Sequence, residues 1–341
     1  MKPLVTVTNW VHQAVLDRLS AHFEVLANSD REPWPEDTLL QNLSRSDGVI
    51  TFMPDMIDES LLNHAKKLKM VSCCLKGYDN FDIDACTRHG VLVSILPDLL
   101  TVPGAELAIG LMITAGRNVI AGDSYIRRGE FKGWRPRFYG TGLEKSTVGI
   151  VGLGAVGRAI AERLKPFGSD VRYWDKARQP VEVEERLDAT FVSFDELLRD
   201  SDFLVVAVSL NAQTRHIINA ERLAKMKPGA ILINFARGSL VDEAAVSKAL
   251  DSGGLGYYAA DVFEFEDWSI ADRPKQVHQG LIENRSKTLL TPHIGSAVTR
   301  VREEMAMQAA ENLIEFFDGK IPQGALNAEQ VGRHKGIGSN A

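Results

Sequence analysis

A glycine-rich loop near the middle of the chain constrains the fold more than any other feature of the sequence. Gly152, Gly154 and Gly157 directly follow the apolar residues 148–151 and open a helix-like stretch at 158–164. The first glycine permits a tight turn, the second lets the backbone approach a pyrophosphate, and the third lets helix and strand pack closely. The N-terminus of the helix attracts the phosphate charge. A lone glycine pattern also marks ordinary turns, but this context predicts a site for a dinucleotide.

An acidic residue further along supports this interpretation. Asp175 stands at the end of the next strand candidate, 18 residues beyond Gly157. A carboxylate at that place accepts hydrogen bonds from the adenosine ribose and repels the 2′-phosphate of NADP. We therefore predict NAD as the cofactor. Lys176 and Arg178 lie close by and partly offset the repulsion, so we expect some tolerance of NADP.

Short apolar runs alternate with helix-like stretches along the rest of the chain. The strand candidates are 4–8, 49–52, 68–74 and 91–95 in the first series, and 147–151, 171–174, 203–208, 230–235, 256–262 and 288–290 in the second. This alternation predicts parallel, doubly wound α/β sheets. A chain of 341 residues, 45% of them hydrophobic, is long for a single core, so we expect two domains.

Three segments connect or extend these series. Residues 102–118 are almost wholly apolar and have the length of a buried helix, which suits a connector between the domains. Residues 127–145 are polar and aromatic and predict an irregular arm of the kind that often makes dimer contacts. Helical spacing over 296–317 predicts a helix that returns the chain to the first domain, and the tail after Gly319 is expected to be loose.

Charge and cysteine content exclude several classes of protein. The 39 lysines and arginines against 45 aspartates and glutamates give a formal net charge of -6, whereas nucleic acids and anionic membranes require a concentrated basic surface. Cys73, Cys74 and Cys86 suit neither a disulfide framework nor a spaced zinc site, so we expect buried free thiols and no metal. The sequence has neither a membrane-spanning apolar run nor a leader-like N-terminus, so we expect a cytoplasmic protein.

Three polar residues follow the last three strand candidates, at the edge where open α/β sheets bind ligands. Taken singly, Arg237 suits a helix cap or the surface, Glu266 a solvated position and His293 a packed one. Taken together, Arg237 offers a planar fork of donors to an oxyanion, and His293 transfers a proton near neutral pH. Glu266 would orient the imidazole and favour its charged form. We therefore predict an active site for a small anionic substrate.

Four motifs of the second half are similar to those of the D-2-hydroxyacid dehydrogenase family. They are the glycine loop at 152–157, Asn-Phe-Ala-Arg-Gly at 234–238, Asp-Val-Phe-Glu-Phe-Glu at 261–266 and Thr-Pro-His-Ile-Gly at 291–295. The resemblance implies a homodimer in which Arg237, Glu266 and His293 are catalytic. It also implies a cofactor site at Lys76, Gly152, Gly154, Ala155, Val156, Gly157, Asp175, Val208, Ala236, Asp261, His293 and Gly295.

The same resemblance implies a particular architecture. A doubly wound parallel Rossmann sheet is inserted in a smaller, flavodoxin-like α/β domain. The substrate domain comprises residues 1–100 and 297–330, and the NAD-binding domain comprises 101–296, with a dimerisation arm near 119–145. The tail at 331–341 is loose.

Further runs, outside the shared motifs, resemble the phosphonate (phosphite) dehydrogenases of this family. Among them are Leu-Lys-Gly-Tyr-Asp-Asn-Phe-Asp at 75–82, Pro-Asp-Leu-Leu-Thr-Val-Pro at 97–103 and Gly-Trp-Arg-Pro at 133–136. They imply NAD-dependent oxidation of phosphite to phosphate, in which His293 activates the water that supplies the oxygen, and Lys76 joins Arg237 on a multiply charged oxyanion. The implied substrate pocket comprises Met53, Lys76, Trp134, Tyr139, Arg237 and Ser296. Without the resemblance, Lys76 suits an exposed position and the large side chains suit packing.

Two departures and two alternatives accompany this expectation. Gly104 stands in place of a threonine and Ser209 in place of a proline, and both are expected to alter cofactor affinity. One alternative is a D-2-hydroxyacid dehydrogenase or 2-ketoacid reductase acting on hydroxypyruvate, glyoxylate, glycerate or lactate, in which Arg237 holds a carboxylate and His293 is the acid/base. The other is a non-enzymatic, dinucleotide-sensing corepressor, which the absence of long tails and basic regions disfavours.

Overall fold

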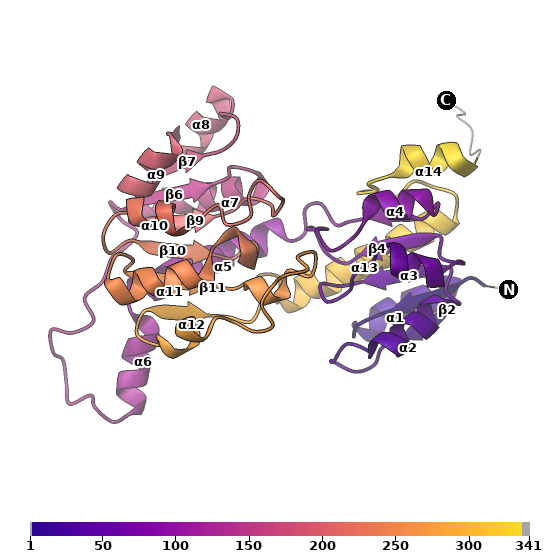
Figure 1. Cartoon of the computed structure of the whole chain (residues 1–341), viewed down its shortest axis with the longest axis horizontal. Helices are drawn as coiled ribbons and strands as arrows, with labels where there is room; N and C mark the ends of the chain where they lie inside the picture. Colours follow the sequence, from indigo (N-terminus) through magenta and orange to yellow (C-terminus); the bar gives the residue numbers. More distant parts are fainter. Residues whose placement is uncertain (1, 336–341) are drawn as a thin grey trace. The chain divides into compact units, whose positions relative to one another are not determined.

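The computed structural model describes residues 2–335, which form two compact α/β units (Figure 1). The first unit comprises the residues up to Leu100 and those from Ala297 onward, and the second comprises Thr101–Ser296. The chain therefore leaves the first unit once and returns to it once. None of the helices between residues 2 and 335 combines the length and the apolar character that a bilayer crossing requires.

The first unit contains a five-stranded sheet in the order β2-β1-β3-β4-β5, in which all pairs are parallel. Its strands are β1 (Leu4–Val7), β2 (Glu24–Ala27), β3 (Gly48–Thr51), β4 (Met70–Cys73) and β5 (Leu92–Ser94). This is the flavodoxin-like order, as expected. The short edge strand β2 was not among the predicted strands; none of its four residues is fully buried.

Within residues 2–335, the helices of this unit are α1 (Gln13–His22), α2 (Glu36–Leu43), α3 (Glu59–His64), α4 (Ile83–Arg88), α13 (Thr299–Phe317) and α14 (Ala328–Lys335). The long helix α13 packs on α1 and β4, and Ser72 in β4 donates a hydrogen bond to the carbonyl of Ala309 (2.8 Å). Helix α14 corrects the expectation of a loose tail from residue 331, since the chain stays helical to Lys335. Residues 336–341 of that tail lie outside the described residues.

The three cysteines belong to the first unit. Cys73, Cys74 and Cys86 are buried and free, as predicted. Burial raises the pKa of the Cys74 and Cys86 thiols to about 12. Thiolates react and bind metals, whereas neutral buried thiols pack as small apolar groups, so these cysteines contribute to the core.

The second unit contains a seven-stranded parallel sheet in the order β12-β11-β10-β9-β6-β7-β8. Its strands are β6 (Thr147–Val151), β7 (Asp170–Trp174), β8 (Ala189–Phe191), β9 (Phe203–Val206), β10 (Ile231–Asn234), β11 (Tyr257–Ala260) and β12 (Thr288–Leu290). The strand order reverses between β6 and β9, which confirms the doubly wound Rossmann sheet. The edge strand β8, Ala-Thr-Phe, was missed because only one of its three residues is buried and a polar residue stands in the middle.

The helices of this unit are α5 (Thr101–Gly116), α6 (Val119–Arg127), α7 (Ala155–Leu164), α8 (Val181–Leu187), α9 (Phe194–Asp200), α10 (Ala220–Lys225), α11 (Glu243–Ser252) and α12 (Gln279–Glu283). Short 3₁₀ segments are η1 (Lys165–Phe167), η2 (Gly238–Leu240) and η3 (Glu264–Glu266). Helix α5 packs against α7, β10 and β11. The apolar helix predicted as a connector is therefore part of the core of the second unit, because its apolar residues face that sheet.

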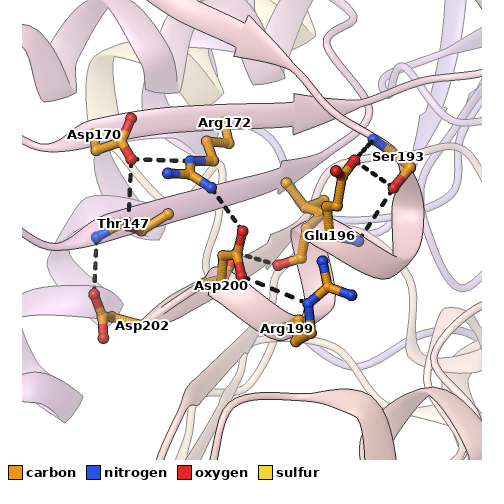
Figure 2. Close-up of polar contacts among 10 residues, drawn as sticks. Thr147, Asp170, Arg172, Ser193, Glu196, Arg199, Asp200 and Asp202 are labelled. Atoms are coloured by element: carbon orange, nitrogen blue, oxygen red, sulfur yellow. Dashed lines mark hydrogen bonds and ion pairs between the residues drawn. The ribbon is translucent and has the colours of Figure 1, made fainter.

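Charged side chains form ion pairs and hydrogen bonds at the amino ends of β6 and β7 (Figure 2). Arg172 pairs with Asp170 (2.9 Å) and Asp200 (2.7 Å), and the backbone N–H of Thr147 donates to Asp202 (2.9 Å). The side chains in these pairs are partly exposed, so each pair adds little stability. The residues predicted for chemistry in this unit follow the opposite, carboxyl ends of the strands.

Candidate active site

The loop between β6 and α7 is packed tightly on one side and open on the other. Gly152 has a φ of +97°, and a Cβ there would lie 2.6 Å from Cγ1 of Val208. A Cβ on Gly157 would collide with the carbonyl oxygen of Gly152. At Gly154, the N-cap of α7, no atom of the described residues lies within 4 Å of the Cβ position. This open helix N-terminus fits the pyrophosphate of a dinucleotide.

Asp175 follows β7 and is tied to this loop. Its Oδ2 accepts a hydrogen bond from the backbone N–H of Leu153 (2.9 Å). Of the two nearby cations, Arg178 pairs with Glu184 (2.8 Å), while Lys176 donates to the neutral side chain of Gln213 (2.7 Å). The charge of Arg178 is thus offset by Glu184, so Lys176 is the better candidate for binding a 2′-phosphate.

Gly104 and Ser209, the two departures near the predicted cofactor site, differ in their surroundings. A Cβ on Gly104 would lie 3.7 Å from Phe235 and 3.9 Å from Val156, which are ordinary contact distances. The glycine therefore leaves space beside the loop. The carbonyl of Ser209 accepts a hydrogen bond from the hydroxyl of Thr214 (2.7 Å), which closes the turn after β9. Their effect on cofactor affinity stays a prediction.

Arg237 lies in the turn between β10 and η2. The fully buried side chain of Asn234 builds this turn: its Nδ2 donates to the carbonyl of Arg237 (2.8 Å), and its Oδ1 accepts from the N–H of Ala236 (3.3 Å). Nη1 of Arg237 donates to the carbonyl of Ala236 (2.9 Å). Asn234 was not among the predicted site residues. The signal that could have found it was a polar residue at the end of an apolar strand.

Glu266 and His293 form a direct pair. Nδ1 of His293 lies 2.9 Å from Oε2 of Glu266, and Oε1 of Glu266 accepts from the backbone N–H of Phe263 (2.7 Å). The side chains of His293 and Glu266 are 29% and 18% exposed. When Nδ1 carries a proton, it donates a hydrogen bond to the carboxylate. Nε2 is then the ring nitrogen that is available for proton exchange with a substrate. The pair that the sequence predicted is therefore formed within the second unit.

The segment that carries His293 is held by Asp261. Oδ1 of Asp261 accepts from Ile294 N–H (2.8 Å) and the Thr291 hydroxyl (2.6 Å), and Oδ2 accepts from Gly295 N–H (2.8 Å). Burial raises the pKa of Asp261, and these hydrogen bonds oppose that shift. His293 itself has a φ of +53°, a conformation that a non-glycine residue rarely adopts without support. Asp261 thus positions the segment of His293, the predicted acid/base residue.

The remaining predicted pocket residues are distributed over the two units and the arm. Ser296 is buried at the end of the second unit, next to the His293 segment. Trp134 and Tyr139 lie on the irregular arm and are 77% and 79% exposed. Met53 and Lys76 belong to the first unit, where burial lowers the pKa of Lys76 and Asp98 opposes this shift. The substrate contacts of these residues stay predictions.

A dehydrogenase that uses a nicotinamide cofactor needs a site for that dinucleotide, a group that moves a proton and a group that holds the substrate. The carboxyl edge of the second sheet offers a dinucleotide loop, a histidine paired with a carboxylate, and an arginine. The class that the fold and the site define is the NAD(P)-dependent dehydrogenases. Within this class, the order of the motifs along the chain indicates a particular family.

Comparison with known proteins identifies the family. The family model described as "D-isomer specific 2-hydroxyacid dehydrogenase, NAD binding domain" matches residues 109–295. The glyoxylate reductase of Pyrococcus horikoshii is 40% identical over 336 residues, which cover 97% of this chain and 98% of that enzyme. This chain belongs to the D-isomer specific 2-hydroxyacid dehydrogenase family.

Solved structures agree with this assignment. A protein of Thermus thermophilus has a TM-score of 0.85 and 34% identity, with 95% of this chain and 99% of that one covered. The NADPH-dependent glyoxylate/hydroxypyruvate reductase of Sinorhizobium meliloti, solved with NADP and malonate, has a TM-score of 0.80 and 28% identity, with 96% and 97% covered. The second unit is therefore the NAD(P)-binding domain of an oxidoreductase.

Proposed function

We propose that this chain is a dehydrogenase that interconverts a small 2-keto acid, of the size of glyoxylate, and the corresponding 2-hydroxy acid. The observation that carries the proposal is the 2.9 Å pair between His293 and Glu266 at the same sheet edge as Arg237. The full-length similarity to a glyoxylate reductase supports the same substrate class. This reaction was the alternative that the sequence left open beside phosphite oxidation.

The chain's own residues account for charge and proton movement in this reaction. When bound, NADH supplies the hydride. The planar guanidinium of Arg237 holds the substrate carboxylate through two parallel hydrogen bonds. Nε2 of His293 gives a proton to the keto oxygen during reduction and takes it back during oxidation. The side chain of Glu266 accepts a hydrogen bond from Nδ1–H of His293 and so orients the imidazole and stabilises its charged form.

A second candidate is the oxidation of phosphite to phosphate. It is favoured by the runs at 75–82, 97–103 and 133–136, which resemble phosphonate dehydrogenases outside the motifs of the whole family. In this reaction NAD, when bound, would accept the hydride from phosphorus, a water oxygen bonds to phosphorus, and His293 takes a proton from that water. Lys76 and Arg237 would bind the phosphite oxygens, and a multiply charged anion suits two cations.

We also propose NAD as the preferred cofactor, with partial use of NADP, and a homodimer that forms through the arm. Asp175 disfavours a 2′-phosphate, whereas Lys176 beside it attracts one. The Sinorhizobium meliloti relative is NADPH-dependent, so both cofactors occur among similar proteins. The exposed aromatic residues of the arm support its role as a contact surface.

One absorbance assay separates the candidates. Purified protein is mixed with NADH or NADPH and glyoxylate or hydroxypyruvate, and, in parallel, with NAD and phosphite, D-lactate, D-glycerate or formate. Consumption of NADH with keto acids supports the first candidate, and NADH formation with phosphite alone replaces it by the second. An absence of turnover with every substrate, together with bound protein partners in a pull-down, would favour the corepressor-like alternative.

A further inference from the structure

The two segments that carry Arg237 and Glu266 are joined by a pair of glutamates that the proposed mechanism does not use. Oε1 of Glu243 accepts the backbone N–H of Glu264 (2.8 Å), and Oε1 of Glu264 accepts the backbone N–H of Glu243 (2.9 Å). Glu243 begins α11, six residues after Arg237, and Glu264 begins η3, two residues before Glu266. Each side chain thus holds the backbone of the other segment.

Neighbouring contacts reinforce this junction. The backbone N–H of Ser239 in η2 donates to Oδ2 of Asp267 (2.6 Å), directly after Glu266. A Cβ on Gly238 would collide with the backbone of Phe263, so the two segments touch without intervening side chains. Oε2 of Glu264 lies 3.1 Å from Nε2 of His216, whose backbone N–H donates to the carbonyl of Ser239 (2.7 Å).

Glu243 occupies an unfavourable place for a charge. It is 2% exposed, and burial raises its pKa to about 7, although the N–H groups of Glu264 and His278 stabilise the carboxylate. Apolar side chains would join two segments without that penalty. Carboxylate hydrogen bonds are directional, however, and hold the partner backbone at a defined distance and angle. Precise alignment, more than stability, is what this pair supplies.

We propose that Glu243 and Glu264 are positioning residues, which set the placement of Glu266, and through it of His293, relative to Arg237. The inference rests on the proposed function only in that Arg237, Glu266 and His293 are taken to act together. Removal of the Glu264 side chain leaves only one of the two hydrogen bonds that join η3 to α11, so Glu266 aligns His293 less well. A displacement of about 1 Å from reactive geometry lowers rates by up to about a hundredfold.

Steady-state kinetics test the inference on the full-length protein, with whichever substrate the wild type turns over. We expect Glu264→Ala to lower kcat about tenfold or more, with the Kd for NADH unchanged. Glu264→Gln keeps an oxygen for the N–H of Glu243 and is expected to restore most of the activity. Glu243→Ala serves as the second variant, and it is expected to lower kcat in the same way, because it removes the acceptor for the N–H of Glu264.

The matched control is Glu196→Ala, which removes the capping box that Glu196 forms with Ser193 at the start of α9 (Figure 2). This residue lies in the same unit but outside the site, so the variant loses stability with no change in kcat. A merely structural role for Glu264 would make the two variants alike.

A double-mutant cycle asks whether Glu264 acts through Glu266. In a Glu266→Gln background the pair with His293 is already weakened, so we expect Glu264→Ala to have little further effect on kcat. Equal fold-losses in both backgrounds would overturn the inference, because they would show that Glu264 acts independently of Glu266.

A measurement without substrate keeps the inference separate from the proposed function. A proton held between Nδ1 of a histidine and a carboxylate gives an NMR resonance far downfield, and His293→Ala identifies the resonance of this pair. We expect it to be lost or broadened in Glu264→Ala and retained in Glu196→Ala. If no substrate is turned over, the proposed function fails while this test still stands. Full retention in Glu264→Ala overturns the inference even if turnover is found.

Discussion

His293 illustrates how much of the site depends on individual side chains that hold the backbone. Its φ of +53° is unfavourable for a histidine, and the buried carboxylate of Asp261 compensates by binding the N–H groups of the two residues that follow it. Asn234 has the corresponding role in the turn of Arg237. At this scale, the groups proposed to move protons and bind anions are separate from the groups that hold them in place.

The assignment of His293 as the acid/base predicts a specific kinetic defect. His293→Ala should lower kcat about a hundredfold or more, because general acid–base catalysis contributes rate factors of this size. The Kd for NADH, measured by fluorescence titration, should stay close to that of the wild type. Near-normal turnover would remove His293 from its role.

Asp175 predicts a change in cofactor preference. In Asp175→Ala, the ratio of kcat/KM with NADH to that with NADPH should fall about tenfold or more, since a hydrogen bond to a charged group is lost and a repulsion is relieved. The mutation also frees the N–H of Leu153, so the KM for NADH should rise. An unchanged ratio would show that Asp175 does not select the cofactor.

At the scale of the elements, the candidate site lies where a helix or a 3₁₀ segment begins directly after a strand. The loop between β6 and α7 permits close approach because its glycines remove side chains at two crowded positions and one open position. The segments after β10 and β11 are joined by reciprocal hydrogen bonds between α11 and η3. The carboxyl edge is therefore a set of short segments in fixed positions.

Replacement of a loop glycine by alanine should have a different effect at Gly157 than at Gly154. Gly157→Ala places a methyl group against the carbonyl of Gly152 and should lower the free energy of unfolding by about 1–3 kcal/mol. Gly154→Ala meets open space, so it should lose less stability but bind NADH more weakly. Urea unfolding and NADH titration of both variants measure this; equal stabilities would contradict the packing seen here.

Glu243 predicts how stability depends on pH. Burial raises its pKa to about 7 from an ordinary 4.5, so between these values the folded protein holds a proton that the unfolded chain releases. The free energy of unfolding therefore falls as the pH rises through this window, by about 3 kcal/mol at most. Glu243→Gln does not titrate and should lose less stability between about pH 5 and about pH 8.

Urea unfolding at both pH values tests this prediction. Asp55, whose pKa burial raises to about 6, contributes with the same sign in both proteins and cancels in the comparison. A wild type and a variant with the same loss of stability over this range would show that Glu243 does not hold a proton in the folded state.

At the scale of the whole molecule, the chain forms two α/β units, each with a parallel sheet. One segment of the second unit exposes apolar side chains. Figure 1 shows α6 and the loop after it extending away from the sheet of that unit. Ile126, Phe131, Trp134 and Tyr139 on this segment are all more than half exposed. An exposed group of large apolar side chains marks a protein interface.

The arm predicts a homodimer in solution. Light scattering coupled to size-exclusion chromatography should give twice the chain mass of 37.6 kDa. The double variant Trp134→Ser/Tyr139→Ser should shift the equilibrium towards the monomer, because it removes apolar area from the proposed contact. A wild-type chain that is monomeric at micromolar concentration would contradict the prediction.

The sequence by itself determined the class of fold and the order of the chemical groups. Strands buried on both faces appear as apolar runs, and the glycine loop has a local conformational requirement, so β6, α7 and the central strands follow from neighbouring residues alone. The positions of Arg237, Glu266 and His293 after successive strands also follow, since the carboxyl ends of parallel strands meet at one edge.

Only the tertiary structure decided the contacts that make these groups a site. The edge strands β2 and β8 are short and only partly buried, and the pairing of residues with a sheet neighbour decides whether they form. Glu266 and His293 are 27 residues apart, and Glu243 and Glu264 are 21 apart. Local periodicity reports which face of an element is buried, whereas hydrogen bonds between distant segments depend on how those elements pack.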